Sequence, residues 1–193
     1  MKIAVYGAAS SLIDSSYKQA GIELGRKIAQ RGHGLVFGGG ANGMMGALAE
    51  GVHEEQGYIL GVVPEFFHES NPEVSYKECS EYIYTDTMRE RKRQMEENCD
   101  AFIITPGGIG TLDEFFEILT LKQLGRHNKA IVIYNINGFF DELAGSLYKM
   151  VKEQFIANDC VELCKVSTDA DEILEYIEAY DPKDIDISKV KIR

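Results

Sequence analysis

"AFIITPGGIGTLDEF", residues 101 to 115, joins a short apolar run to a glycine-rich loop and then to an acidic, amphipathic segment. The apolar run has the length of a strand and is bounded by Pro106, which is typical of a buried parallel strand. Gly107, Gly108 and Gly110 allow a tight turn, and Thr111 is a residue that often begins a helix. The stretch therefore predicts a strand–loop–helix unit, the building block of an α/β fold.

The rest of the chain repeats this alternation. Further strands are expected over residues 2–7, 34–40, 58–64 and 130–135 and over the less apolar 81–85. Helices are expected over residues 16–31, 43–55, 88–98, 111–125, 139–153 and 169–179. The order predicts a Rossmann-like parallel sheet with helices on both faces, in three layers. Residues 1–180 would form one domain and 181–193 a tail, with residues 64–80 as the longest irregular stretch.

Composition narrows the classes of function. The chain has 193 residues, 45% of them hydrophobic, and a net charge of −11. Such an acidic chain is a poor binder of nucleic acid, which is held largely by clustered Lys and Arg. No apolar stretch approaches a membrane span, and no signal-like segment opens the sequence, so we expect a cytoplasmic location without membrane partners. The four cysteines include no C-x-x-C and are expected to be reduced thiols without a metal.

The loop at 106–111 allows two interpretations. Free N–H groups at the positive end of the following helix would seat a phosphate. Alternatively, Thr111 and Glu114 have the spacing of a capping box, in which Glu114 only bonds back to the Thr111 N–H. Spacing alone favours neither. A carboxylate beside a bound phosphate also requires a cation between the two anions, or a reaction that uses both.

A second glycine-rich loop, GGGANGMMG at residues 38 to 46, lies between a predicted strand and a predicted helix. Gly38, Gly40 and Gly43 match the G-x-G-x-x-G pattern of dinucleotide sites, with Glu65 after the next strand. That pattern normally follows the first strand, where this chain has GAASS, so NAD is the disfavoured interpretation. Close packing of helix on sheet explains at least Gly46. Neither loop ends in G-K-[ST], so ATP hydrolysis has no support.

TMRERKRQMEE, residues 87 to 97, is the dense basic cluster of the chain. Such a run is usually a solvated helix face with ion pairs one turn apart. The pairs expected here are Lys92–Glu96 and Arg93–Glu97. Four cations within five residues exceed what these pairs use. Arg91 lies at helical spacing from Met88 and Met95, so we expect it to turn inward and to supply the missing cation.

These residues carry a resemblance to a known family. Residues 106 to 114, PGGIGTLDE, match P-G-G-x-G-T-x-x-E in full, and residues 88 to 92, MRERK, resemble M-H-x-R-K. Both motifs are hallmarks of the Lonely Guy (LOG) family, and residues 38 to 46 are similar to its G-G-G-x-x-G-x-M-G. The similarity runs from Lys2 to about Ala179. The departures are Arg89 in place of the usual histidine and GAAS after the first strand, which bear on the preferred base rather than on the reaction.

The resemblance implies hydrolysis of the N-glycosidic bond of adenine-type nucleoside 5′-monophosphates, either AMP or its N6-prenylated, cytokinin-type derivatives. The products are the free base and ribose 5-phosphate, and neither a cofactor nor a metal is implied. Arg91 and Glu114 would form the catalytic pair. The residues implied at the nucleotide are Gly39, Gly40, Glu73, Met88, Lys92, Gly107, Gly108, Ile109, Gly110, Thr111, Asp113 and Thr120. Because loop length varies, Glu69 and Glu78 are the alternatives to Glu73.

The chemistry of the residues agrees with this implication. Cleavage of an N-glycosidic bond develops positive charge on the ribosyl ring, which a carboxylate such as Glu114 would stabilise. No residue stands out as the general acid for the departing base, and the four histidines lie outside the motifs.

Two other classes remain open. A carrier of a phosphorylated ligand, similar to the molybdenum-cofactor carrier proteins, would use the same glycine loops without chemistry, and an NAD-dependent oxidoreductase is the third class. Arg91 and Glu114 favour the enzyme over the carrier. An older description of the family as lysine decarboxylases has no support, because no lysine lies in a recognisable pyridoxal-phosphate context.

The segment FFEILTLKQL, residues 115 to 124, carries more apolar surface than one face of a sheet needs. Such an excess is commonly buried against a partner. The resemblance likewise implies a homodimer with the site near the subunit interface.

Overall fold

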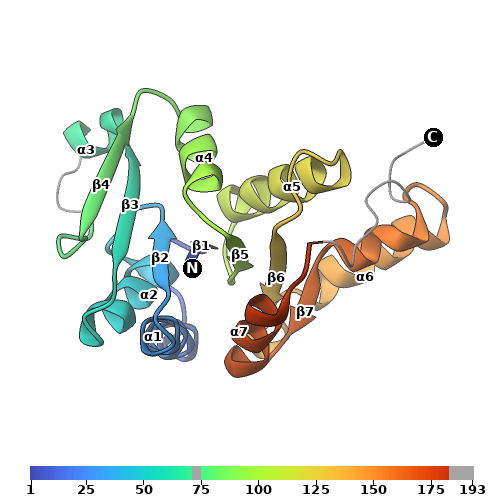
Figure 1. Ribbon diagram of the computed structural model, residues 1–193, viewed down its shortest axis with the longest axis horizontal. Helices are drawn as coiled ribbons and strands as arrows, with labels where there is room; N and C mark the ends of the chain where they lie inside the picture. The colour runs from blue at the N-terminus through green and yellow to red at the C-terminus, as the bar shows by residue number, and fades with distance from the viewer. Residues whose placement is uncertain (71–74, 183–193) are drawn as a thin grey trace.

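Seven parallel strands form one sheet in the computed structural model, which describes residues 1–70 and 75–182. Their order across the sheet is β4-β3-β2-β1-β5-β6-β7 (Figure 1). The strands are β1 Lys2–Tyr6, β2 Gly34–Phe37, β3 Ile59–Pro64, β4 Glu81–Thr85, β5 Ala101–Ile104, β6 Ala130–Tyr134 and β7 Lys165–Ser167. The central strands are buried almost along their whole length, because helices cover both faces of the sheet.

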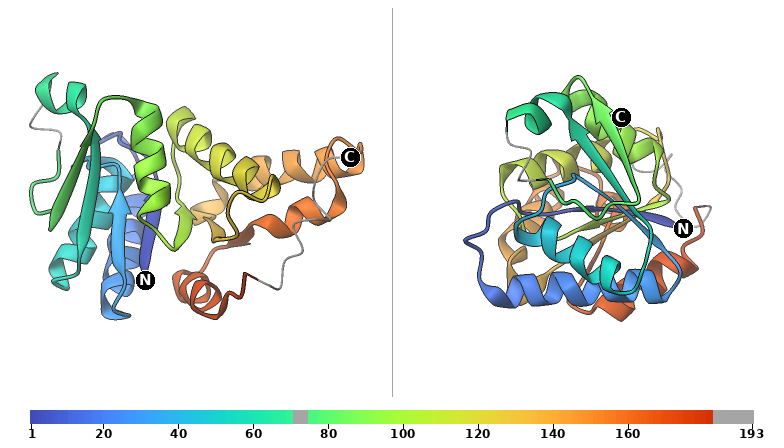
Figure 2. Two further views of the ribbon diagram at one scale, coloured as in Figure 1. Left: turned by 45° about the horizontal axis from the view of Figure 1, so that its top comes forward. Right: turned by 90° about the vertical axis from the view of Figure 1, so that its left-hand side faces the viewer.

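The helices divide between the two faces (Figures 1 and 2). Helices α1 Ser15–Gln30, α2 Gly43–Glu54 and α7 Ala170–Ala179 cover one face, and α4 Met88–Glu97, α5 Ile109–Gln123 and α6 Asp141–Lys152 cover the other. Alternate residues of β1 serve the two cores: Ile3 packs with α1 and α2, whereas Ala4 packs with α4 and α5. The predicted three-layer, Rossmann-like fold is confirmed.

Several boundaries differ from the sequence predictions. Helix α3, Glu65–Ser70, and the 3₁₀ segment η3, Asn158–Leu163, lie where no element was expected, as does β7. All three are too short to show a periodic apolar pattern. Residues 183–193 lie outside the described residues, so a domain boundary near residue 180 stays a prediction.

The order in which the chain adds strands to the sheet reverses at β1, and this reversal determines where the site lies. The chain continues from β1 to β2 on one side, while β5 pairs with β1 on the other, with Tyr6 opposite Ile104. The loops that leave β1 and β5 therefore diverge above the sheet, although the Ala8 N–H donates to the Pro106 carbonyl at 3.0 Å. Crevices of this kind bind ligands in open α/β sheets. Within residues 1–70 and 75–182, no helix has the length and apolar character needed to cross a membrane.

Candidate active site

A cavity of about 680 Å³ opens at this crevice, between the loops after β1 and β2, the end of β3, helices α3 and α4 and the first turns of α5. Its lining residues are 7–10, 38–40, Asn42, Met45, Val63, Pro64, Phe67, Ser75, Met88, Arg91, Gly108, Gly110, Thr111, Asp113 and Glu114. The charged side chains in this set are Arg91, Asp113 and Glu114. Glycine loops and charged groups from two helices, Arg91 of α4 and Asp113 and Glu114 of α5, thus meet in one cavity.

Arg91 and Glu114 form a buried ion pair at the wall of the cavity. Arg91 Nη1 lies 2.6 Å from Glu114 Oε1, and the two side chains are only 9% and 10% exposed. Arg91 Nε also donates to the Val62 carbonyl in β3, at 3.1 Å. The expectation that Arg91 turns inward is confirmed, since Arg91 and Met95 are the buried residues of α4. Two contacts fix the guanidinium in one orientation.

Gly38 provides the space that the guanidinium occupies. A Cβ atom at this position would come within 2.0 Å of Arg91 Nη2. Gly43, the first residue of α2, has a φ of +63°, and a Cβ there would meet the Ala8 carbonyl at 2.4 Å. Room for Arg91 and backbone packing therefore account for two of the three glycines that match the dinucleotide pattern.

Helix α5 begins earlier than its sequence suggested. The N-cap is Gly108, which offers no side-chain cap, and Thr111 is the third helical residue. The first bond within the helix runs from the Leu112 N–H to the Gly108 carbonyl at 3.1 Å, so the N–H groups of residues 109–111 have no acceptor inside the helix. Glu114 faces Arg91 instead of the first turn. The predicted N-cap at Thr111 is wrong, and with it the capping-box interpretation of Glu114.

Gly107 allows the loop to fold closely over β1. A Cβ atom there would meet Thr111 Oγ1 at 2.1 Å and the Ala8 nitrogen at 3.0 Å. On the opposite wall Gly39, with a φ of +75°, accepts a hydrogen bond from the Tyr76 N–H at 2.8 Å, and Gly40 forms a bridge with Ser75. Backbone therefore forms much of the surface that a ligand would meet.

Burial and the ion pair with Arg91 have opposite effects on the pKa of Glu114. Burial raises the pKa of the carboxyl, Arg91 lowers it, and the net pKa lies above the ordinary value for glutamate. The carboxylate is therefore more basic than one in water, and its negative charge faces a shielded cavity where electrostatic interactions are strong. This arrangement suits the stabilisation of a developing cation or the acceptance of a proton from water.

Lys92 differs from Arg91 in its surroundings. It is not among the cavity-lining residues; its ammonium lies 3.0 Å from Asp113 Oδ2 and makes a shorter contact with Glu117 Oε2. The expected Lys92–Glu96 pair is replaced by these contacts between helices, whereas the expected Arg93–Glu97 pair is present at 2.7 Å.

The remaining residues that the family resemblance implies at the nucleotide do not all lie at the cavity. Met88 lines the cavity, whereas Ile109, between the lining residues Gly108 and Gly110, does not line it and is 88% exposed. Thr120 lies about three turns beyond Ile109 on α5 and lines a different groove. Glu73 falls outside the described residues, and Glu78 is exposed and does not line the cavity.

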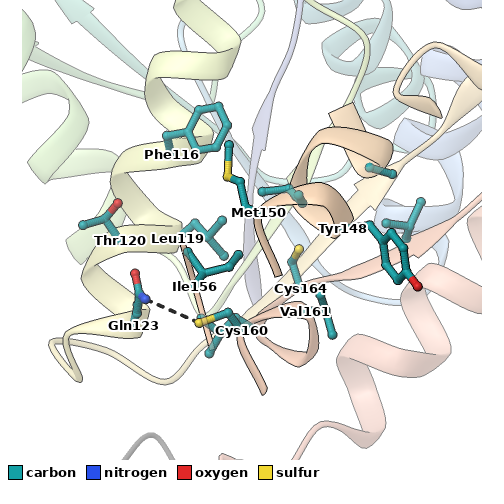
Figure 3. A pocket seen from close by; sticks show the side chains of 14 residues that line it. Phe116, Leu119, Thr120, Gln123, Tyr148, Met150, Ile156, Cys160, Val161 and Cys164 are labelled. Atoms are coloured by element: carbon teal, nitrogen blue, oxygen red, sulfur yellow. Dashed lines mark hydrogen bonds between the residues drawn. The ribbon is translucent and has the colours of Figure 1, made fainter. Parts of the chain in front are cut away.

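That second groove, of about 340 Å³, runs between α5, α6, η3 and β7 (Figure 3). Phe116, Leu119, Met150 and Ile156 give it an apolar lining, and Gln123 donates a hydrogen bond to Cys160 Sγ at 3.4 Å. Helix α6 contributes Leu147 and Tyr148, yet none of the residues of α6 is fully buried within this chain. Its apolar side therefore stays partly open along the groove.

Three contributors to the site were not identified from the sequence. Gly38 was interpreted as part of a dinucleotide pattern, the Val62 carbonyl belongs to a strand without polar side chains, and Glu117 was not singled out. Only the i,i+4 spacing of Asp113 and Glu117 signalled a shared cation.

Fold and cleft place the protein among Rossmann-like α/β proteins with a ligand crevice at the switch point of the sheet. A family model described as possible lysine decarboxylase matches residues 45–177. The cytokinin riboside 5′-monophosphate phosphoribohydrolase LOG2 of Arabidopsis thaliana is 34% identical over 98% of this chain and 88% of its own. The corresponding LOG protein of Oryza sativa subsp. japonica is 36% identical over 94% of this chain and 74% of its own. The chain belongs to the LOG family.

Solved structures with this fold include molybdenum-cofactor proteins. The Moco carrier protein of Chlamydomonas reinhardtii aligns with a TM-score of 0.70 at 21% identity, covering 92% of this chain and 94% of that chain. The molybdenum cofactor binding protein of Rippkaea orientalis has a TM-score of 0.70 at 20% identity, covering 92% and 95%. At these identities the likeness shows a shared fold.

Proposed function

We propose that this protein is a phosphoribohydrolase that cleaves the N-glycosidic bond of adenine-type nucleoside 5′-monophosphates to the free base and ribose 5-phosphate. AMP and N6-prenylated AMP are the proposed substrates. The relatives named as cytokinin riboside 5′-monophosphate phosphoribohydrolases support the reaction class. The observation that carries the proposal is the buried Arg91–Glu114 pair, which opens onto a cavity beside an uncapped helix N-terminus.

In this proposal the 5′-phosphate sits at the start of α5. The N–H groups of residues 109–111 have no acceptor within the helix, and the helix dipole adds positive potential there. Gly107, Gly108 and Gly110 keep side chains out of the way, and Thr111 adds a hydroxyl at the wall of the cavity. The phosphate would thus be held largely by backbone, which suits a chain with a net charge of −11.

Glu114 lies one turn into the same helix, within reach of a sugar whose phosphate is anchored there. Its carboxylate stabilises the positive charge that develops at C1′ as the bond to the base lengthens, and it orients or deprotonates the attacking water. Arg91 holds Glu114 ionised despite burial, and its planar fork is suited to ribose or phosphate oxygens. Asp113 faces the cavity as an acceptor for ribose hydroxyls. Gly39, Gly40 and Met88 form the wall proposed for the base.

Two alternatives are disfavoured by the same residues. A carrier protein would need the glycine loops but has no evident use for a buried Arg–carboxylate pair. A pyridoxal-phosphate decarboxylase requires a lysine for its Schiff base, and no lysine lines the cavity among the described residues.

The location that we propose is the cytoplasm, where nucleoside monophosphates are made and where free thiols such as the four cysteines persist.

The monophosphate should be required for turnover. Adenosine lacks the group that the α5 N–H groups would bind, and the loss of about two charge-assisted hydrogen bonds costs a few kcal/mol. We expect kcat/KM for adenosine to be lower than for AMP by roughly several tens-fold or more. Comparable release of adenine from both substrates, followed by chromatography, would place the phosphate elsewhere.

We further propose a homodimer in which the apolar groove between α5 and α6 faces a second copy of the chain. The support is the partly open apolar side of α6 and the position of Thr120 in this groove rather than in the cavity of its own chain. If Thr120 contacts a nucleotide, as the family resemblance implies, the nucleotide is the partner's. The site would then lie near the subunit interface.

Light scattering at micromolar concentration should give twice the mass of the 21.6 kDa chain. Tyr148→Asp should shift the protein toward monomer, because Tyr148 lines the groove yet is 68% exposed, so the fold does not depend on it. Leu12→Asp, at an exposed leucine of the β1–α1 loop, serves as the control. A monomeric wild type would contradict the dimer.

A further inference from the structure

Lys92 belongs to a second bridge between helices α4 and α5, which pack on the same face of the sheet (Figures 1 and 2). Arg91 and Lys92 are consecutive on α4, and Asp113 and Glu114 are consecutive on α5. The pair Arg91–Glu114 faces the cavity, whereas Lys92 binds Asp113 and, one turn further, Glu117. The two helices are thus tied by one bridge inside the cavity and a second bridge beside it.

The second bridge is partly withdrawn from solvent. The Lys92 side chain is 15% exposed, and the Oε2 atom of Glu117 that it contacts is buried, although the Glu117 side chain as a whole is 40% exposed. Burial tends to lower the pKa of Lys92, but the hydrogen bonds to Glu117 and Asp113 outweigh it, and the net pKa is raised. The ammonium is therefore charged and held by its two carboxylates at neutral pH.

This arrangement leaves little of Lys92 for a substrate phosphate. One ammonium compensates two carboxylates, and moving it into the cavity would leave the buried Glu117 oxygen beside no cation. The move would give up both ion pairs, although the two carboxylate side chains, 59% and 40% exposed, keep access to solvent. The backbone at the start of α5, which has no such competing partner, is better placed to hold the phosphate.

We propose that Glu117 is a positioning residue for the reaction. Glu117 holds Lys92 of α4 against α5. This contact sets the spacing of the two helices, so that Arg91 meets Glu114 at the cavity wall. The kinetic test of this inference rests on the proposed function. The inference also makes Lys92 part of the bridge between the helices and not a ligand of the phosphate.

The kinetic test compares Glu117→Gln with Glu97→Gln. Both changes remove a carboxylate from an ion pair, but the Arg93–Glu97 pair lies in the exposed part of α4 and away from the cavity. Glu117→Gln should lower kcat for AMP about tenfold with KM changed by less than about twofold, because a misplaced Arg91 weakens the reaction more than binding. Glu97→Gln should match the wild type.

Lys92 variants separate the two roles of this lysine. Lys92→Met should resemble Glu117→Gln, keep the preference for AMP over adenosine, and show no further loss in the double variant. Lys92→Arg, which keeps the cation, should restore most of kcat. If Lys92→Met instead raises KM for AMP and abolishes the preference over adenosine, Lys92 is a phosphate ligand and the inference is wrong. It is also wrong if Glu117→Gln behaves like the wild type.

A second readout does not depend on activity. In the wild type, the Arg91 Nε–H is buried and donates to Val62, so its ¹⁵N NMR signal should be sharp and slow to exchange. Glu117→Gln should broaden this signal or speed its exchange at least fivefold, whereas Glu97→Gln should not. An unchanged signal overturns the positioning role. If the wild type releases no base but the signal responds as expected, the proposed function fails, whereas the conclusion that Glu117 positions Arg91 stands.

Discussion

Replacing Glu114 with glutamine is expected to lower kcat for AMP on the order of a hundredfold or more, in a protein that still folds. The substitution removes the negative charge that meets the developing ribosyl cation, while the shape of the side chain hardly changes. Loss of one strong, preorganised electrostatic contact costs roughly 3–4 kcal/mol of transition-state stabilisation. The measurement is kcat for AMP in the wild type and the variant.

Thermal stability has to be recorded beside this measurement. In Glu114→Gln the Arg91 guanidinium stays buried next to a neutral amide, so a lower Tm is expected, and the assay belongs well below it. Because helix α5 is not capped by Glu114, a capping role cannot explain lost activity. A folded variant that keeps more than about a third of the wild-type kcat, a deficit well under 1 kcal/mol, would favour the carrier function.

Arg91→Ala should cause a loss of similar size, on the order of a hundredfold in kcat. The guanidinium keeps Glu114 ionised and oriented, so the two side chains act as a unit and the double variant should be little worse than either single one. Arg93→Ala is the matched control, since Arg93 lies on the same helix but points to solvent, with a side chain that is 73% exposed. Fully additive losses would mean that the pair does not act together.

The pH profile of Arg91→Ala distinguishes its effect on Glu114 from a loss of contacts to substrate. Burial raises the pKa of Glu114 and Arg91 opposes that rise. The carboxyl is ionised above its pKa, so wild-type kcat/KM should fall as the pH drops through a value above that of an ordinary glutamate. Without Arg91 the pKa rises further, and the acid limb should move to higher pH. An acid limb that does not move would separate Arg91 from the ionisation of Glu114.

Local patterns were sufficient for most of the fold. The Val- and Ile-rich runs of β1, β2, β3, β5 and β6 and the amphipathic segments between them predict the layers, because buried parallel strands need little but apolar side chains. Strand β7 has only three residues, KVS, and follows a 3₁₀ segment, so no periodic signal marks it. Its place at the sheet edge depends on pairing with β6, which is a long-range interaction.

The site was predictable where one helix carries the signal. The spacing of Arg91 from Met88 and Met95 predicts which cation of the basic run turns inward. The start of α5 was misplaced, because Thr111 is a good cap by composition while the Gly108 backbone begins the helix in fact. The pairing of Lys92 with Asp113 and Glu117 joins residues more than twenty positions apart on two packed helices, which local spacing does not reveal.

The central claim, that the cavity hydrolyses a nucleoside monophosphate, is tested most directly by following the products. The purified protein is incubated with AMP and, separately, with the 5′-monophosphate of N6-isopentenyladenosine, and the mixtures are separated by chromatography. We expect free base and ribose 5-phosphate in equal amounts from at least one of the two substrates, and about a hundredfold less of both with Glu114→Gln over the same time. A wild-type protein that returns both nucleotides intact would contradict the proposed function.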